Sequence, residues 1–114
     1  MRNEPSFEQV ADAYLSYAEN LWSAEHLMNL IQTKPDEAWQ IITRVIESAS
    51  ENTISIAAAG PLEEFVVAHG EDYLEVISAY ARTSLKMRLA LGGVWQETRM
   101  PKKVWRQIQK LAGS

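Results

Sequence analysis

The chain has 114 residues, of which 46% are hydrophobic and 23% are charged, a balance typical of a globular protein that folds in water. This length predicts one domain over residues 1–114, with a single hydrophobic core. The absence of cysteine excludes a disulfide framework, a thiol nucleophile and a cysteine-ligated metal site. We find neither an apolar run of membrane-helix length nor a signal-peptide pattern, so we expect a cytoplasmic protein without a membrane partner.

Charge is distributed unevenly along the chain. Residues 1–75 carry 14 acidic and three basic residues, a net charge of −11. Residues 76–114 carry eight basic residues and one acidic residue, a net charge of +7. This division does not decide the fold, but it bears on partners, because an acidic surface attracts basic molecules and a basic surface attracts anions.

Apolar residues at helical spacing predict a chain built from helices. In the first half of the chain, the spacing predicts helices that begin at Ser6, Ser23, Pro35 and Thr53 and end near residues 20, 34, 48 and 59. Ser23 is the expected N-cap of the second helix, since its side-chain oxygen can accept a backbone N–H. Pro35 suits a first helical position, where a missing N–H costs nothing.

The stretch from Ala57 to Gly70 predicts a helix end, a sharp corner and a complete short helix. Gly60 can adopt the backbone conformation of a corner, and Pro61 then starts the helix. Gly70 is expected to stop that helix as a C-terminal cap. The residues at the spacing of one buried stripe are Leu62, Phe65, Val66 and His69.

Three further helices are expected over residues 71–82, 84–91 and 101–111, with a stop at Gly92 and Gly93. All four prolines fall at predicted helix starts, and no hairpin turn signal is present. The sequence therefore predicts an all-α fold of about seven to eight short helices in antiparallel pairs. Their arrangement is expected to be an irregular bundle or a short array resembling helical repeats.

The two histidines are the first candidates for chemistry. His69 could act as a general base with Glu63, but a spacing of six residues puts the two on different helical faces. We favour a structural role, in which His69 hydrogen-bonds the last carbonyls of its own helix. His26 has no third ligand at metal-binding spacing, so neither a metal site nor a cofactor is predicted.

A dense acidic group surrounds Gly70. Its members are Glu63, Glu64, Glu71, Asp72 and Glu75. Paired carboxylates can perform glycosidase chemistry or bind a divalent cation, but no spacing here forces two of them to converge. The helix dipole explains several of them as first-turn residues. The acidic residues from Asp36 to Glu75 nevertheless exceed what helix ends require, which indicates an acidic face for a basic partner.

The last predicted helix has the opposite charge. Its basic set consists of Arg99, Lys102, Lys103, Arg106 and Lys110. Lys102 and Lys103 lie at the positive end of the helix dipole, and local rules are most often broken at functional sites. This helix could meet nucleic acid, an acidic protein or an anionic surface, or it could dock against the chain's own acidic part. Among the tryptophans, Trp39 is expected in the core, whereas Trp95 either anchors a partner or packs the last helix onto the body.

Four short motifs resemble a family of small bacterial all-helical domains of unknown function. They are Ala58-Ala59-Gly60-Pro61-Leu62-Glu63, His69-Gly70, Leu91-Gly92-Gly93-Val94-Trp95 and Val104-Trp105. The resemblance covers residues 35–108 and implies a helical fold and a bacterial or phage source, without a catalytic assignment. It singles out Glu63, His69, Trp95 and Trp105 as residues to test.

The leading hypothesis is a non-enzymatic protein-binding module. We expect a small acidic inhibitor or immunity protein that neutralises a basic partner such as a toxin or a nuclease, a class that includes phage proteins that mimic DNA. The expected binding residues are Asp36, Glu37, Glu64, Glu71, Asp72, Glu75 and Trp95. The alternatives are nucleic-acid binding through the basic last helix, an enzyme that uses His69 and Glu63, and self-association of the basic end with the acidic face.

Overall fold

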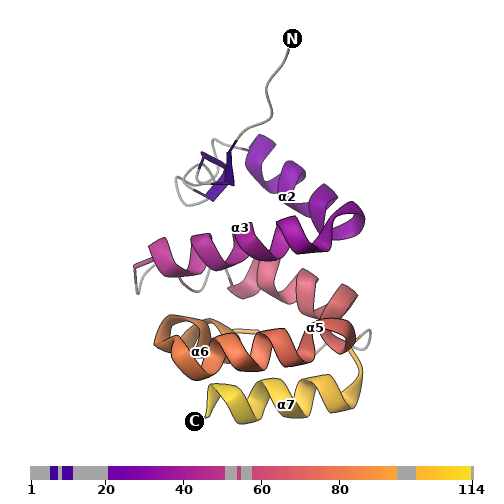
Figure 1. Cartoon of the computed structure of the whole chain (residues 1–114), viewed down its shortest axis with the longest axis vertical. Helices are drawn as coiled ribbons and strands as arrows, with labels where there is room; N and C mark the ends of the chain where they lie inside the picture. The colour runs from indigo at the N-terminus through magenta and orange to yellow at the C-terminus, as the bar shows by residue number, and fades with distance from the viewer. Residues whose placement is uncertain are drawn as a thin grey trace.

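The helices are stacked in layers along the longest axis of the molecule, which measures 44 Å (Figure 1). The computed structural model describes residues 6–7, 9–11, 21–50, 54, 58–94 and 100–113, and these residues form helices and no strand. The elements are α2 (Leu21–Thr33), α3 (Pro35–Ser48), η1 (Ala58–Leu62), α5 (Glu63–Thr83), α6 (Leu85–Gly92) and α7 (Lys102–Ala112). The predicted all-α fold is confirmed.

The joint between α2 and α3 follows from Pro35. Helix α2 ends at Thr33 and α3 runs from Pro35 to Ser48, as predicted. Because proline has no N–H, the carbonyl of Ile31, four residues earlier, receives no helical hydrogen bond from position 35. The prediction of Ser23 as an N-cap is wrong, since Ser23 lies within α2 and only 1% of its surface is exposed.

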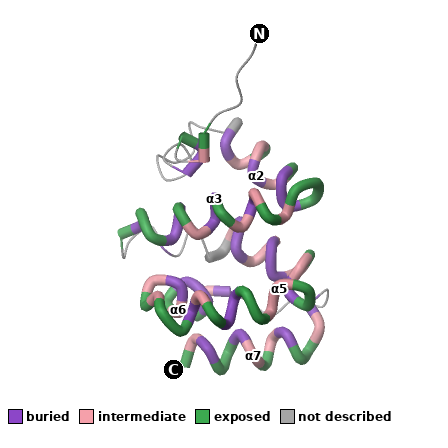
Figure 2. The backbone as a smooth tube through the Cα atoms, in the orientation of Figure 1, coloured by how far each residue is buried: buried purple, intermediate pink, exposed green. Residues whose placement is uncertain are grey.

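The hydrophobic core lies where the layers meet (Figure 2). The largest side chains that are almost completely buried include Leu27, Ile31, Ile41, Ile42, Ile46, Leu62, Phe65, Ile77, Met87, Leu91 and Ile108. They come from every helix described, so each helix contributes one apolar side to a shared core. Trp39, which was expected in the core, is half-buried and packs against it.

Two predictions about residues 60–70 are wrong. The expected corner at Gly60 and Pro61 is instead a turn of π-helix, η1, that contains Pro61 and leads directly into α5. Proline is tolerated there because N–H groups in a first helical turn need no helical partner. Gly70 does not end a helix either. It lies inside α5, which is 21 residues long and continues to Thr83.

Helix α5 bends around Trp39. The indole of Trp39 lies 5.4 Å from the ring of Phe65 and 6.0 Å from the ring of Tyr80, measured between centroids. Phe65 and Tyr80 are fifteen residues apart in α5, and a straight helix would separate them by about 22 Å along its axis. The two halves of α5 accordingly run in different directions (Figure 1), and Gly70 lies between the two ring contacts.

From Ser84 onward the chain follows the prediction closely, whereas the separate helix expected over residues 71–82 is the second half of α5. Ser84 caps α6, since its side-chain oxygen accepts the N–H of Met87 at 3.1 Å, and α6 ends at Gly92. Helix α7 begins one residue after Pro101 and buries Val104, Ile108 and Leu111. The predicted helix from Ser6 is described only at residues 7 and 9–11, which are helical. Most of that helix, and most of the predicted helix over 53–59, lies outside the described residues.

Candidate functional site

His69 caps a helix, but not its own. It lies within α5 rather than at the helix end, and its Nε2 donates a hydrogen bond to the carbonyl oxygen of Ile31 in α2 at 2.6 Å. This carbonyl is the one that Pro35 leaves without a helical donor. The ring of His69 also lies against the rings of Phe65 and Tyr73. These contacts hold the imidazole ring against the backbone of α2 and against two aromatic rings of its own helix, which favours a structural role.

We expect replacement of His69 by alanine to lower the free energy of unfolding by about 1–3 kcal/mol, because the Ile31 carbonyl loses its donor. Urea denaturation followed by circular dichroism measures this loss. The control is His26→Ala in α2, where we expect a clearly smaller change. Equal losses in the two variants would contradict the capping role.

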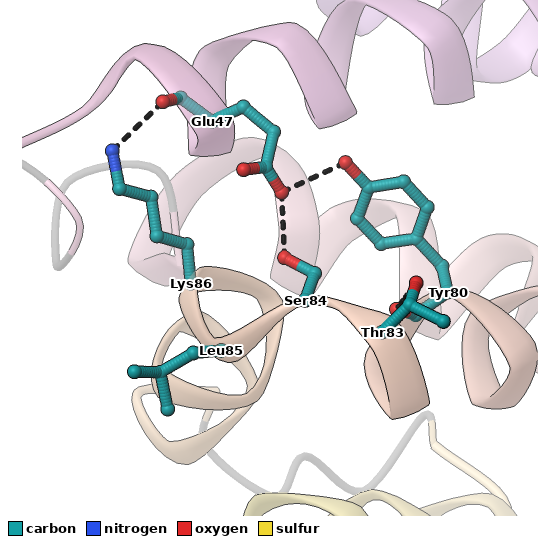
Figure 3. A pocket seen from close by; sticks show the side chains of 6 residues that line it. All are labelled: Glu47, Tyr80, Thr83, Ser84, Leu85 and Lys86. Carbon is teal, nitrogen blue, oxygen red and sulfur yellow. Dashed lines mark hydrogen bonds between the residues drawn. The ribbon is translucent and has the colours of Figure 1, made fainter.

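A polar joint connects α3 to the end of α5 and the start of α6 (Figure 3). One carboxylate oxygen of Glu47 accepts hydrogen bonds from the hydroxyl of Tyr80 at 2.8 Å and the hydroxyl of Ser84 at 2.5 Å. These groups line an open pocket of about 550 Å³ together with Thr83, Leu85 and Lys86. Sequence reasoning did not single out Glu47, since its partners lie more than thirty residues away in the chain.

Two basic side chains of α6 stabilise the ends of other helices. The ammonium group of Lys86 donates to the carbonyls of Glu47 at 2.8 Å and Ala49 at 3.0 Å, at the C-terminal end of α3. The guanidinium of Arg88 donates to the carbonyl of Ala81 at 2.6 Å, near the end of α5. Cations are favoured at these helix ends because the carbonyls there are negative. The pocket is therefore a structural joint whose polar groups bond to one another.

The structure brings acidic residues from two helices together. Tyr73 of α5 donates a hydrogen bond from its hydroxyl to the carboxylate of Asp36, in the first turn of α3. Asp72 adjoins Tyr73 in the same turn of α5. We use the name acidic surface for Asp36 and Glu37 of α3 with Glu71, Asp72 and Glu75 of α5. All five are exposed except Glu37, which is partly covered and lies 3.8 Å from the ammonium group of Lys34. Asp36 and Asp72 both act on Tyr73, whereas Glu75 lies on the side of α5 toward α7, where it lines a pocket with Gln107.

Some of the predicted binding residues lie elsewhere. Glu63 and Glu64 are half-buried in the first turn of α5, about two turns before Asp72. Trp95 and Arg99 lie outside the described residues. The acidic surface thus contains five of the seven predicted partner-binding residues, and Glu64 is separate from it.

Two tyrosines at the contact between α3 and α5 have raised pKa values. The hydrogen bond to Asp36, burial and the negative charges of Asp36 and Asp72 raise the pKa of Tyr73 from 10.0 to about 12. Burial, the hydrogen bond to Glu47 and the charge of Glu47 raise the pKa of Tyr80 to about 12. Each neighbouring carboxylate disfavours the tyrosinate because like charges repel.

We expect the protein to lose stability between pH 10 and pH 12. In the unfolded chain the two tyrosines lose their protons near pH 10, whereas in the folded protein Tyr73 and Tyr80 keep them to about pH 12. The unfolded state then binds fewer protons, so the free energy of unfolding falls as pH rises through this window. Urea denaturation between pH 9 and pH 11 should show a shallower fall for Tyr73→Phe and Tyr80→Phe. Slopes equal to that of the wild type would refute the raised pKa values.

The predicted basic residues of α7 lie together on its solvent side. Lys102, Lys103, Arg106 and Lys110 are exposed, and α7 contains no carboxylate. We call these four residues the basic face. Helix α7 packs on α5 and α6 through its opposite, apolar side. Trp105 is half-buried and packs against the core.

The chain matches a known protein family. A family of unknown function, DUF6869, matches residues 11–114. The chain belongs to this family. No curated protein matches the chain, and no solved structure does. Membership in DUF6869 agrees with the resemblance to a family of unknown function, and it assigns no substrate or partner.

The described residues hold neither a metal-binding group nor a membrane-spanning helix. No three histidine or carboxylate side chains in the described ranges are grouped so that they could hold a metal ion. Among the helices that the structure describes, none has the length and apolar character to cross a membrane.

Proposed function

We propose that this member of DUF6869 is a non-enzymatic binding module that holds a basic protein partner on its acidic surface. The observation that carries the proposal is the bond from Tyr73 to Asp36, because it fixes Asp36 of α3 near Asp72 of α5. A surface built on two packed helices keeps its shape before the partner arrives. Binding then costs less conformational entropy than it would on a flexible acidic segment.

The chemistry of this surface suits lysine and arginine. Asp36 and Asp72 both act on the half-buried Tyr73, so a cation bound there lies near two carboxylates. Tyrosine is enriched among the residues that dominate binding energy at interfaces. The surrounding negative charge speeds encounter with a cationic surface, and salt weakens that attraction.

The class of partner follows from the size and charge of the chain. A net charge of −11 over residues 1–75 suits a small inhibitor or immunity protein that covers the basic surface of a toxin or nuclease. A protein that mimics the phosphates of DNA belongs to the same physical class. Enzymatic chemistry at His69 receives less support, because its Nε2 is bound to the Ile31 carbonyl.

Nucleic-acid binding is the second candidate. The specific observation in its favour is the basic face of α7, with four exposed cations and no carboxylate. Against it, helices α2, α3 and α5 carry nine carboxylates and only two arginines, so their net negative charge repels a phosphate backbone.

The test is affinity capture from a lysate of the source organism at low and high salt, with mass spectrometry of the retained proteins. We expect one basic protein to be retained at low salt and lost at high salt. A variant with Glu71→Gln, Asp72→Asn and Glu75→Gln should retain at least about tenfold less of it. Capture of nucleic acid instead, or capture that survives both high salt and the three substitutions, would refute the proposal.

A further inference from the structure

A polar groove lies between helices α5 and α7. Its volume is about 510 Å³, within the usual range of small-ligand sites. The two helices pack closely at Gly70 and Val104, so the walls of the groove are held in place before a ligand arrives. The groove is lined by Leu74, Glu75, Ser78, Ala79 and Arg82 of α5 and by Gln107 of α7.

The groove carries one charge of each sign. Glu75, Ser78 and Arg82 follow the i, i+3, i+7 spacing, so they lie along one face of α5. From Glu75 to Arg82 the helix rises about 10.5 Å along its axis. Both charged side chains are exposed, and neither forms an ion pair within the part of the chain that the structure describes. The groove therefore presents a carboxylate toward one end and a guanidinium toward the other.

Uncharged polar groups lie between these two charges. Ser78 is only 6% exposed, and its Oγ accepts a hydrogen bond from Nε2 of Gln107 at 3.5 Å. A bond of this length is weak, and the amide oxygen of Gln107 accepts no bond from a described residue. A hydroxyl and an amide together offer donors and acceptors, which match the C=O and N–H of a peptide unit.

We infer that this groove binds a short zwitterionic peptide of about three residues in an extended conformation. The N-terminal ammonium of the peptide lies at Glu75, its C-terminal carboxylate at Arg82, and its peptide units at Ser78 and Gln107. Three extended residues span about 10–11 Å, which matches the rise of α5 between the two charges. A guanidinium can hold a carboxylate through two parallel hydrogen bonds.

Other classes of small ligand match these groups less well. A polyanion such as a nucleotide is repelled by Glu75, and a polyamine is repelled by Arg82. A single amino acid carries its ammonium and carboxylate groups on one carbon atom, too close together for side chains two helical turns apart. The inference goes beyond the proposed function and does not depend on it, because Arg82 and Gln107 are not part of the acidic surface.

Titration of trialanine into the isotope-labelled full chain, followed by two-dimensional NMR, tests this inference. We expect a dissociation constant of about 0.1–1 mM, given the small size of the ligand. The shifts should centre on the backbone amides of residues 74–82 and the side-chain amide of Gln107. Trialanine with both ends blocked carries no charge and should bind at least about tenfold more weakly. No shift at about 20 mM trialanine, or equal binding of the blocked peptide, would overturn the inference.

Charge reversal at the two ends makes the test specific. E75R leaves two cations in the groove and R82E leaves two carboxylates, so each should weaken trialanine binding at least about tenfold. The double variant has one charge of each sign again, and it should recover binding with the peptide in the opposite direction. Both positions are exposed, so all three variants should unfold in urea close to wild type. A double variant that binds as weakly as the single variants would contradict the inference.

Matched controls carry the same changes of charge outside the groove lining. E25R in α2 and K102E in α7 alter exposed residues, and we expect both to bind trialanine as the wild type does. Losses equal to those of E75R and R82E would mean that net charge rather than the groove decides binding, and would overturn the inference.

The R82E variant also separates this inference from the proposed function. It keeps the acidic surface, so it should capture the basic protein partner while it no longer binds trialanine. A wild-type protein that captures the partner but does not bind trialanine would overturn the peptide groove alone. A wild-type protein that binds trialanine but captures no basic partner would overturn the proposed function alone.

Discussion

Replacement of Phe65 by alanine is expected to lower the free energy of unfolding by about 3–5 kcal/mol. The side chain is fully buried, and its ring lies 5.4 Å from that of Trp39 and 4.9 Å from that of Tyr73. The ring of Phe65 packs between Trp39 of α3 and Tyr73 of α5, near the bend in α5. Truncation would leave a cavity that neither half of α5 can fill without giving up contacts elsewhere.

The matched control is Val76→Ala, also in α5, where 44% of the side chain is exposed. We expect a change within about 0.5 kcal/mol, since surface substitutions outside special features have small effects. Urea denaturation followed by circular dichroism gives both values. A loss below about 1 kcal/mol for Phe65→Ala would mean that the aromatic cluster does not organise the bend.

Gly70→Ala is expected to destabilise the protein by about 1–3 kcal/mol, although alanine favours helix more than glycine does. A Cβ atom at position 70 would lie 2.8 Å from Cγ1 of Val104 and 3.3 Å from Cγ1 of Val66. Real Cβ atoms essentially never approach another atom to 2.8 Å, so the Val104 side chain or α7 itself would have to shift. The glycine is therefore explained by the close approach of α7.

A double-mutant cycle with Val104→Ala tests this reason directly. Removal of the two Cγ atoms of Val104 opens the space that the new Cβ at position 70 requires. In the Val104→Ala background, Gly70→Ala should cost less than in the wild type, with a coupling of about 0.5–3 kcal/mol. Additive losses would show that the contact with Val104 is not the reason for glycine at this position.

Local sequence signals were sufficient to predict the positions of several helices. Pro35, followed by two acidic residues, predicted α3 from Pro35 to Ser48. The spacing of Val104, Ile108 and Leu111 predicted α7 to within one residue at each end. Gly70 was misassigned because glycine serves two purposes. It caps helix ends for local reasons, and it permits close approach of a neighbour such as Val104, which lies 34 residues further along the chain.

The side-chain contacts of the site depended on which helices pack together. His69 was expected to bond helix-end carbonyls, and it does so on α2 rather than on its own helix. A signal was present, since Pro35 leaves the carbonyl of Ile31 without a donor, but the sequence does not say which side chain supplies one. The bond between Tyr73 and Asp36 likewise required the packing of α5 on α3, although both residues lie in segments that the charge pattern had marked.

The measurement that tests the proposed function most directly is the dissociation constant of the captured basic partner, by titration calorimetry, for three proteins. They are the wild type, the Glu71→Gln, Asp72→Asn, Glu75→Gln variant and a matched Lys102→Gln, Lys103→Gln, Arg106→Gln variant. If the acidic surface holds the partner, the acidic-surface variant binds at least about tenfold more weakly and the basic-face variant binds as the wild type does. Unchanged affinity in the acidic-surface variant, or a loss confined to the basic-face variant, would contradict the assignment.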